Sequence, residues 1–184
     1  MSRVFFTSDT HFGCARTLAV RKRPFASVDE MDETLIARWN AAVGEDDEVY
    51  HLGDFASLEG ESLGPILDRL RGRLHLILGN NDDAEAIART RRFATIAEMR
   101  ELTLEGQRIF LCHYPMRDWP NAWRGAWHLF GHVHGRLDRE PLGLSLDVGV
   151  DSHGYAPVAF AAIARTMAGR AAAREATRAR VAAE

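Results

Sequence analysis

The sequence predicts an α/β fold in a single domain spanning residues 1–184. Short apolar runs typical of buried strands alternate along the chain with segments whose apolar residues recur at helical spacing. Polar side chains suited to metal binding or acid–base chemistry follow most of the apolar runs. Because strand ends converge on one edge of the sheet in open α/β folds, we expect these side chains to lie together.

The amino-acid composition indicates which binding partners and which cellular compartment to expect. The chain is 46% hydrophobic and carries a net charge of -3, so no overall basic field attracts nucleic acid or a membrane surface. Two cysteines, Cys14 and Cys112, are too few for a disulfide framework and suit a reducing environment. The sequence shows neither a signal peptide nor an apolar run that would span a bilayer. We therefore expect a cytoplasmic protein without a membrane partner.

The first strand is predicted at Val4-Phe5-Phe6 and runs directly into Asp9-Thr10-His11. A carboxylate and an imidazole just beyond a buried strand occupy the usual position of a site in α/β folds. Ser8 or Asp9 would also cap a following helix, and this stretch taken alone favours the cap over a metal site. Farther on, Ser27 to Glu30 has the form of a capping box, which predicts a helix that ends at Gly44.

Two further strands are each followed by a turn with carboxylate or amide side chains. The strand at 49–52 ends at Gly53-Asp54, and the strand at 74–78 runs into Gly79-Asn80-Asn81-Asp82. Asp82 or Asp83 is suited to cap a helix, so a metal site and a helix cap remain alternatives here too. Helices are expected over about 65–71 and 84–91.

The middle of the chain predicts more strands and an aromatic segment. Residues 93–109 alternate enough for one or two strands, with a turn at Glu105-Gly106, and the strand at 108–113 ends on His113. The segment 116–127 holds three tryptophans together with Arg117 and Arg124. It would either line a substrate cleft, with both arginines binding substrate, or form a loop anchored by its own aromatic side chains.

The stretch Gly131-His132-Val133-His134-Gly135 places two histidines two residues apart, so that they point to the same side of an extended segment. Neutral imidazole is the commonest protein ligand of transition metals, although two surface-loop histidines would look the same. Beyond it, a strand is predicted at 144–151, with His153 just past its end. A helix is expected from Pro157 onward, and residues 168–184 are expected to form a solvated helical or frayed tail.

Seven side chains with nitrogen or oxygen donors lie at or just past the ends of predicted strands. This number suits two divalent ions that share one carboxylate, with water or substrate completing each shell. Mixed imidazole and carboxylate donors favour Mn, Fe or Zn over the oxygen-only shells of Ca and Mg. The seven residues are Asp9, His11, Asp54, Asn80, His113, His132 and His134.

The ordered motifs resemble those of the calcineurin-like metallophosphoesterase superfamily, and most closely its small single-domain bacterial and phage members. The resemblance runs from Phe5 to about Tyr155. It implies a four-layer α/β/β/α sandwich, in which two mixed sheets are flanked by helices and the metals lie at the strand ends. The matching residues are Asp9-Thr10-His11, Gly53-Asp54, Gly79-Asn80 with Asp82, His113 and Gly131-His132-Val133-His134, together with Arg23-Pro24-Phe25 and Cys112-His113-Tyr114-Pro115.

The resemblance also implies the ligands and the reaction. Asp9, His11 and His134 would hold one metal, and Asn80, His113 and His132 the other. Asp54 would bridge two divalent ions, with Mn²⁺ the first expectation and Fe or Zn the alternatives. The implied reaction is hydrolysis of phosphate mono- or diesters by a metal-bridging hydroxide that attacks phosphorus.

The chain departs from the family at Asn81. Family members usually have a histidine at this position, before the aspartate, and it is placed to donate a proton or a hydrogen bond to the leaving oxygen. An asparagine amide donates a hydrogen bond but cannot transfer a proton at pH 7. We therefore expect Asn81 and Asp82 to act at the leaving group, with His153 as a candidate substitute acid. The same departure favours the alternative of a catalytically weak or inactive metal-binding scaffold on this fold.

The expected substrate is a small phosphorylated molecule, with a nucleotide as one candidate. Arg117 and Arg124, together with the neighbouring tryptophans, would grip a nucleotide by stacking and charge. A nuclease is the less favoured alternative, because the sequence shows no basic stripe.

Overall fold

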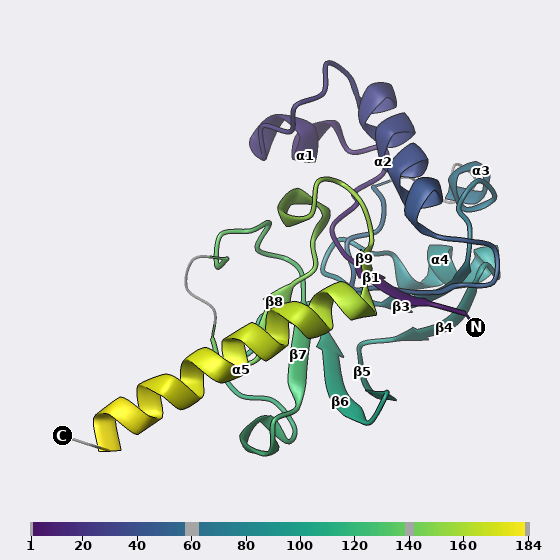
Figure 1. Cartoon of the computed structure of the whole chain (residues 1–184). Coiled ribbons are helices and arrows are strands. Elements are labelled where there is room, and N and C mark those ends of the chain that lie inside the picture. Colours follow the sequence, from purple (N-terminus) through teal and green to yellow (C-terminus); the bar gives the residue numbers. More distant parts are fainter. Residues whose placement is uncertain (1, 58–62, 139–141, 183–184) are drawn as a thin grey trace.

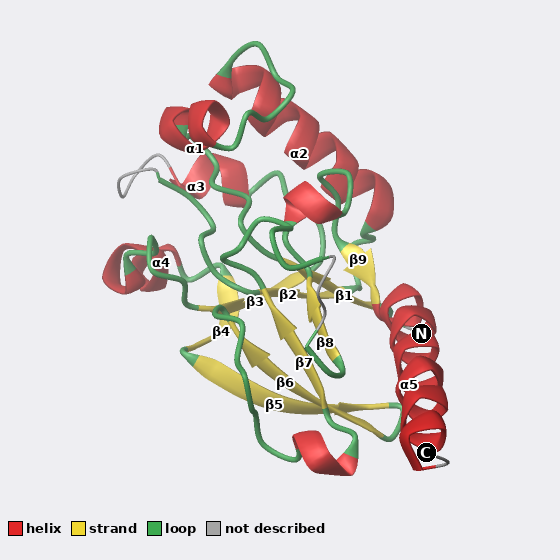
Figure 2. Ribbon diagram, turned by 90° about the vertical axis from the view of Figure 1, so that its left-hand side faces the viewer, coloured by secondary structure: helices red, strands yellow, loops and turns green. Residues whose placement is uncertain are grey.

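The computed structural model describes residues 2–57, 63–138 and 142–182, and its two β-sheets pack face to face (Figure 2). The first sheet has the strand order β4-β3-β2-β1-β9, and the second has the order β5-β6-β7-β8. Helices flank the pair of sheets. The predicted architecture of two mixed sheets flanked by helices is confirmed.

The first sheet is parallel except at one edge, where β9 runs antiparallel to β1. The strands predicted nearest the N-terminus are found within one residue of their expected starts. Their common direction brings the loops after β1, β2 and β3 to the same edge of the sheet. The strands are β1 (Val4–Thr7), β2 (Glu48–His51), β3 (Arg73–Ile77), β4 (Phe93–Ala97) and β9 (Val158–Ala159).

The second sheet begins with an antiparallel hairpin, and its remaining strands run parallel to β6. The hairpin turns at Glu105 and Gly106, which both have positive φ, as a tight two-residue hairpin turn requires. The strand expected to reach residue 151 ends at Asp147, and a 3-10 helix, η3 (Val150–Ser152), follows. The strands are β5 (Met99–Leu104), β6 (Gln107–Cys112), β7 (Trp127–Phe130) and β8 (Ser145–Asp147).

Four helices lie on the side of the first sheet that faces away from the second (Figure 2). They are α1 (Ala15–Val20), α2 (Val28–Ala42), α3 (Leu63–Leu67) and α4 (Ala84–Thr90). The long helix α5 (Phe160–Ala182) runs along the edge of the sandwich formed by β9 and β8 (Figures 1 and 2). No described helix is long and apolar enough to cross a membrane.

Successive residues of the first sheet contribute to two separate cores, because side chains alternate across a strand. Phe5 and Val49 pack with α2 and α3 on the outer face of the sheet. Their neighbours Phe6 and Tyr50 pack between the sheets, against apolar residues of β6 and β7. Burial on both faces explains why these strands are apolar throughout rather than alternating.

The helix predictions needed correction in three places. Helix α1 was not expected; Cys14 caps it by accepting a hydrogen bond from Thr17 N at 3.3 Å. The helix expected from Pro157 begins only at Phe160, because the intervening residues pair with β1 as β9. The helix expected over 65–71 is α3, which starts at Leu63 and ends at Leu67.

Candidate metal centre

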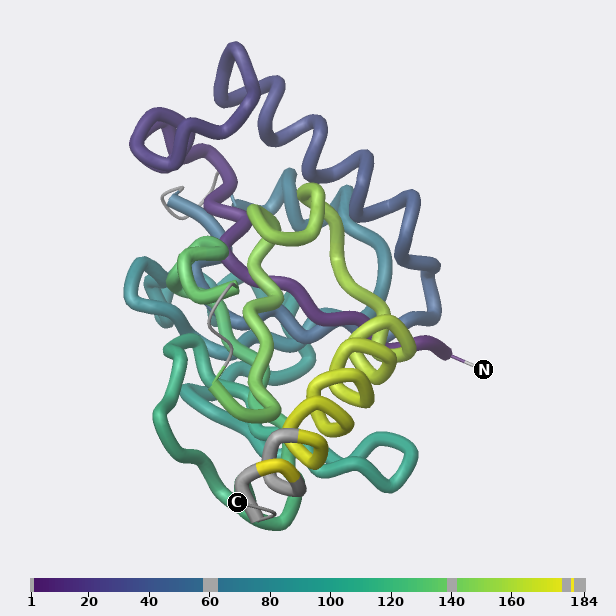
Figure 3. The backbone as a smooth tube through the Cα atoms, turned by 60° about the vertical axis from the view of Figure 1, so that its left-hand side comes forward, coloured from purple at the N-terminus to yellow at the C-terminus, as the bar shows by residue number. Residues whose placement is uncertain are grey.

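The loops that follow β1, β2, β3, β6 and β7 meet at one end of the sandwich and carry all seven predicted ligands. Figure 3 shows the segment after β1 (purple) beside the loop after β7 (green). The loops after β1 and β2 continue to pair beyond their strands: Asp9 N donates to Gly53 O and His11 N to Asp54 O, each at 3.0 Å. Ligands far apart in sequence are thereby held in register.

Asp9, His11 and His134 form a first group, whose ligand atoms all lie within 4.8 Å of one another. Asp9 Oδ1 is 3.9 Å from His11 Nε2 and 3.6 Å from His134 Nε2. The two imidazole rings stack with centroids 5.4 Å apart. Among the described residues, His11 Nε2 is buried and makes no hydrogen bond. This unpartnered nitrogen has the environment of an imidazole prepared to bind a cation.

Asn80, His113 and His132 form a second group. Asn80 Oδ1 lies 3.1 Å from His113 Nε2 and 2.9 Å from His132 Nδ1. His113 Nδ1 donates to the carbonyl oxygen of Leu52 at 2.7 Å, which leaves a lone pair on Nε2 when the ring is neutral. That lone pair faces an amide oxygen, which is also an acceptor. A cation between the two would relieve the repulsion, so the donor set fits a metal.

Asp54 lies between the two groups. Its Oδ2 is 3.5 Å from His11 Nε2 and 3.6 Å from His113 Nε2. Asn81 binds the same carboxylate twice: its backbone N–H donates to Oδ1 at 2.9 Å and its side-chain amide to Oδ2 at 2.7 Å. Asp54 therefore has the position expected of a carboxylate shared by two cations.

The backbone is strained at the ligands themselves. Five of them have φ between 50° and 69°, a region that residues other than glycine rarely adopt. Gly131 is needed for the close approach of two loops, because a Cβ there would lie 2.3 Å from Asp9 Oδ2. Strain concentrated at a site indicates that the surrounding structure holds these side chains in directions they would not adopt freely. The five are Asp9, His11, Asp54, His132 and His134.

Burial dominates the electrostatics of the centre. It raises the pKa of Asp9 well above its usual value, and the carboxylates of Asp147 and Asp54 add to this rise. Burial also lowers the pKa of His11 to about 4 and lowers that of His132. Burial thus favours the neutral form of these two imidazoles, which is the form that binds metal, and crowded carboxylates favour a cation nearby.

Arg23 and Asp151 form an ion pair behind the first group, and neither residue is predicted from the sequence to have a role there. Asp151 Oδ2 accepts a hydrogen bond from His134 Nδ1 at 2.7 Å. Burial opposes ionisation of Asp151, but hydrogen bonds from His134 and Arg23 bring its pKa down to about 2. The two residues are 128 positions apart, so no local pattern could reveal the pair.

The structure places the remaining predicted residues at varying distances from this centre. Asp82 sits beneath it, and its carboxylate accepts hydrogen bonds from the backbone N–H groups of Asp54, Phe55 and Gly79 at 2.8–2.9 Å. His153 Nε2 is 2.7 Å from the carbonyl oxygen of Asp147, at the end of β8. Asp82 therefore joins the loops after β2 and β3 by hydrogen bonds. His153 is instead engaged in a hydrogen bond with the backbone of Asp147.

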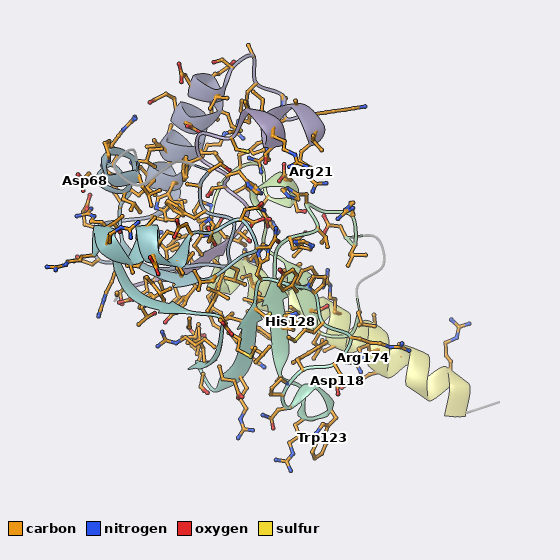
Figure 4. The ribbon with its side chains drawn as sticks, turned by 180° about the vertical axis from the view of Figure 1, so that it is seen from behind. Arg21, Asp68, Asp118, Trp123, His128 and Arg174 are labelled. Atoms are coloured by element: carbon orange, nitrogen blue, oxygen red, sulfur yellow. The ribbon has the colours of Figure 1, made fainter. Side chains whose placement is uncertain are left out.

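Arg117 and Arg124, the two arginines predicted to bind substrate, lie in different parts of the structure. Arg117 lines a cavity of about 180 Å³ beside β7 and β8, together with Met116, Phe130 and other residues. Arg124 belongs to the 3-10 helix η2 (Ala122–Arg124), just before β7 begins, and stacks on Trp123 at 4.3 Å. Trp123 is 80% exposed and lies at the far end of the second sheet (Figure 4). Since the metal ligands follow the other ends of β6 and β7, the structure does not bring Arg124 to the centre.

Comparison with known proteins identifies the family of this chain. A model of the calcineurin-like phosphoesterase superfamily domain matches residues 3–146, a range that includes all seven predicted ligands. An uncharacterized protein of Methanocaldococcus jannaschii is 31% identical over 167 residues, covering 87% of this chain and 88% of that protein. The gene 66 protein of Mycobacterium phage L5 is 33% identical over 187 residues, covering 84% of this chain and 89% of that protein.

The fold is also similar to a solved structure. A crystal structure of a protein of unknown function from Aquifex aeolicus matches with a TM-score of 0.70 at 22% identity, covering 90% of this chain and 100% of that one. The match to the family model spans most of the chain and contains both groups of ligands. The chain therefore belongs to the calcineurin-like phosphoesterase superfamily.

Proposed function

We propose that the protein is a metal-dependent phosphoesterase that hydrolyses mono- or diesters of a small phosphorylated molecule. The observation that carries this proposal is the position of Asp54 Oδ2, 3.5–3.6 Å from one imidazole nitrogen of each group. A carboxylate shared in this way suits two cations held side by side. Mn²⁺ is the first candidate, because the donors mix imidazole, carboxylate and amide.

Two bound divalent cations would supply an acidified water as nucleophile and positive charge for the phosphate oxygens. The chain's own residues set where a substrate can approach. Asn80 and Asn81 are exposed, His132 is half-buried, and Tyr114 packs against His132 in a T-shaped contact with ring centroids 4.8 Å apart. The side chains of the other five ligands, Asp9 among them, are at most 6% exposed. The phosphate ester would thus enter on the side of the two asparagines.

Asn81 determines whether the leaving group receives a hydrogen bond or a proton. Its side-chain amide projects toward Asp54 and is the exposed polar donor nearest to that carboxylate among the described residues. An amide stabilises a departing oxygen by donating a hydrogen bond, but it gives up no proton at pH 7. We therefore expect esters with good leaving groups, such as aryl phosphates, to be cleaved faster than alkyl esters.

The test is ester hydrolysis with controlled metal content. Chelator-treated protein is assayed on p-nitrophenyl phosphate and bis(p-nitrophenyl) phosphate, with and without added Mn²⁺. We expect activity on at least one ester that requires the metal. Asp54→Asn should reduce it by more than the ~10–100-fold loss typical of residues outside the ligand shell. Asp68→Asn makes the same chemical change at an exposed carboxylate paired with Arg92, and should leave activity intact.

A second candidate, the catalytically inactive scaffold, is favoured by one observation, the asparagine at position 81. The same assay separates the two. Protein that binds two Mn²⁺ per chain and cleaves neither ester would contradict the phosphoesterase proposal in favour of the scaffold.

A further inference from the structure

Arg23 is an unusual residue, because its guanidinium is completely buried next to the candidate metal centre. Its side chain has a relative exposure of 0%. Nε donates to Asp151 Oδ1 at 2.9 Å and one terminal nitrogen to Asp151 Oδ2 at 2.8 Å, which makes a bidentate ion pair. The terminal nitrogens also donate to the carbonyl oxygens of Thr10 at 2.9 Å and Asp9 at 2.6 Å. A buried charge is retained only when its hydrogen-bonding capacity is used, as it is here.

The ion pair controls the orientation of His134. Asp151 Oδ2 accepts from His134 Nδ1 at 2.7 Å, and an ionised carboxylate can only accept. The proton of the neutral ring must then sit on Nδ1. The lone pair is left on Nε2, which faces Asp9 Oδ1 at 3.6 Å. The same contact fixes the plane of the ring, because Arg23 holds Asp151 from the other side.

The ion pair also fixes Asp9. This residue follows the end of β1 with φ of 58°, and its carbonyl oxygen lies 2.6 Å from a terminal nitrogen of Arg23. Arg23 supplies a charged donor to that oxygen. On the other side of the residue, the Asp9 carboxylate accepts the backbone N–H of His132 at 2.9 Å. The direction of the carboxylate is therefore set from both ends.

The second group has a different support. His113 is oriented by the carbonyl of Leu52, and the carboxylate of Asp82 joins the loops around Asn80. Among the described contacts, none connects Arg23 or Asp151 to His113 or Asn80. Apart from the hydrogen bond from the His132 N–H to the Asp9 carboxylate, the described hydrogen bonds that orient the two groups are separate.

We propose that Arg23 and Asp151 are positioning residues for the first group of ligands, so that together they set the metal affinity of Asp9, His11 and His134 and leave that of the second group unchanged. The inference rests on the proposed two-metal function. It assigns the Arg23 side chain a specific task in this chain: one guanidinium orients two ligands that are 125 positions apart, one through its backbone and the other through a carboxylate.

The test measures Mn²⁺ binding to the chelator-treated full chain by calorimetric titration, in two backgrounds that each retain one group. His113→Gln leaves the first group, and His134→Gln leaves the second. We expect Arg23→Met to weaken binding by ~10–100-fold in the His113→Gln background, as is typical when a residue supporting a metal ligand is lost. In the His134→Gln background we expect a change of less than about twofold, since Arg23 and Asp151 make no described contact with Asn80, His113 or His132.

Arg3→Met is the matched control. Arg3 also pairs with an aspartate, Asp47, at 2.6 Å and donates to a backbone carbonyl, that of Ala42, at 3.1 Å, but it touches no ligand. It should leave Mn²⁺ binding unchanged in both backgrounds. Asp151→Asn keeps the size of the side chain and should act in the same direction as Arg23→Met. It provides the measurement if Arg23→Met does not fold.

A second readout follows the ring itself. In the metal-free wild-type chain, nitrogen NMR should find the His134 proton on Nδ1, and in Asp151→Asn a mixture of both tautomers. Equal weakening in both backgrounds, or weakening no greater than with Arg3→Met, would overturn the positioning role. A wild-type chain that binds no Mn²⁺ would instead overturn the two-metal proposal, together with the inference that depends on it.

Discussion

The side-chain amide nitrogen of Asn81 lies 2.7 Å from Asp54 Oδ2, the carboxylate oxygen that faces both groups of ligands. The residue that departs from the family's usual histidine is therefore aimed at the centre of the site. Its backbone N–H holds the other oxygen of the same carboxylate at 2.9 Å. We therefore expect Asn81 to offer a substrate bound at Asp54 a hydrogen bond in place of a proton.

Replacing Asn81 by histidine should add the missing acid. We expect Asn81→His to increase turnover of alkyl phosphates toward the ~10²–10⁴-fold that general acid catalysis typically supplies, and turnover of aryl phosphates by much less. The physical reason is that a poor leaving group needs its proton in the transition state. Steady-state rates on a matched alkyl and aryl pair are the measurement. Asn81→Gln controls for side-chain size, and an equal gain on both esters would refute the idea.

Binding of metal should stabilise the fold measurably. Each site saturated at 100 times its Kd contributes about 2.7 kcal/mol to the free energy of unfolding. For a chain of this size, that corresponds to a rise in Tm of about 5–10 °C per site. Thermal denaturation of chelator-treated protein, with and without Mn²⁺, measures the shift. Asp54→Asn should lose most of it and Asp68→Asn none; a wild-type Tm that does not respond to Mn²⁺ would contradict the two-cation centre.

Gly131→Ala should disrupt the centre through sterics alone. The added Cβ would lie 2.0 Å from Ser8 Oγ and 2.3 Å from Asp9 Oδ2, so the loops after β1 and β7 must move apart. We expect a loss of stability of about 1–3 kcal/mol, as is typical of overpacking, and a weaker first metal site.

Gly169→Ala is the matched control, because nothing lies within 4 Å of its added Cβ and the residue is inside α5. Alanine there should stabilise the helix by roughly 0.5–1 kcal/mol. Urea denaturation and Mn²⁺ titration of both variants measure the contrast. Equal Mn²⁺ affinity in the two variants would show that the close approach at Gly131 is not required.

Asp32 makes the stability of the chain depend on pH. Its half-buried carboxylate accepts the backbone N–H of Gly13 at 2.9–3.1 Å, and burial raises its pKa from 3.8 to about 6. The unfolded chain therefore loses this proton first, so the contribution to stability is complete below pH 3.8 and is lost as the pH rises through about 6. Asn keeps the acceptor without the charge.

We thus expect Asp32→Asn to raise the free energy of unfolding above pH 6 by roughly 1 kcal/mol, after allowing for solvent screening of a half-exposed carboxylate. Below pH 3.8 the variant and the wild type should be equally stable. Denaturation of chelator-treated protein on both sides of this window decides the matter, and a gain of the same size at both ends would argue against titration of Asp32.

Many of the strands and candidate ligands of this protein can be predicted from its sequence. A buried strand is recognised from a local run of apolar residues. The Asp, Asn or His residues that follow such a run closely in the sequence are then recognised as candidate metal ligands. For this reason the first three strands, the hairpin at Glu105-Gly106 and the seven candidate ligands were predicted in order. The weak points were elements without a local signal, such as the two-residue β9, which exists only because β1 offers an edge to pair with.

Only the tertiary structure decided how these parts combine. The ring orientation of His134 depends on Asp151, 17 residues away, and Asp151 depends on Arg23, 128 residues away. Arg124, which shares its segment with Arg117, lies at the opposite end of the sheet, because the chain must cross from the end of β6 to the start of β7. Local sequence specifies which donors a strand end carries, whereas burial and long-range hydrogen bonds determine which donors meet and in what protonation state.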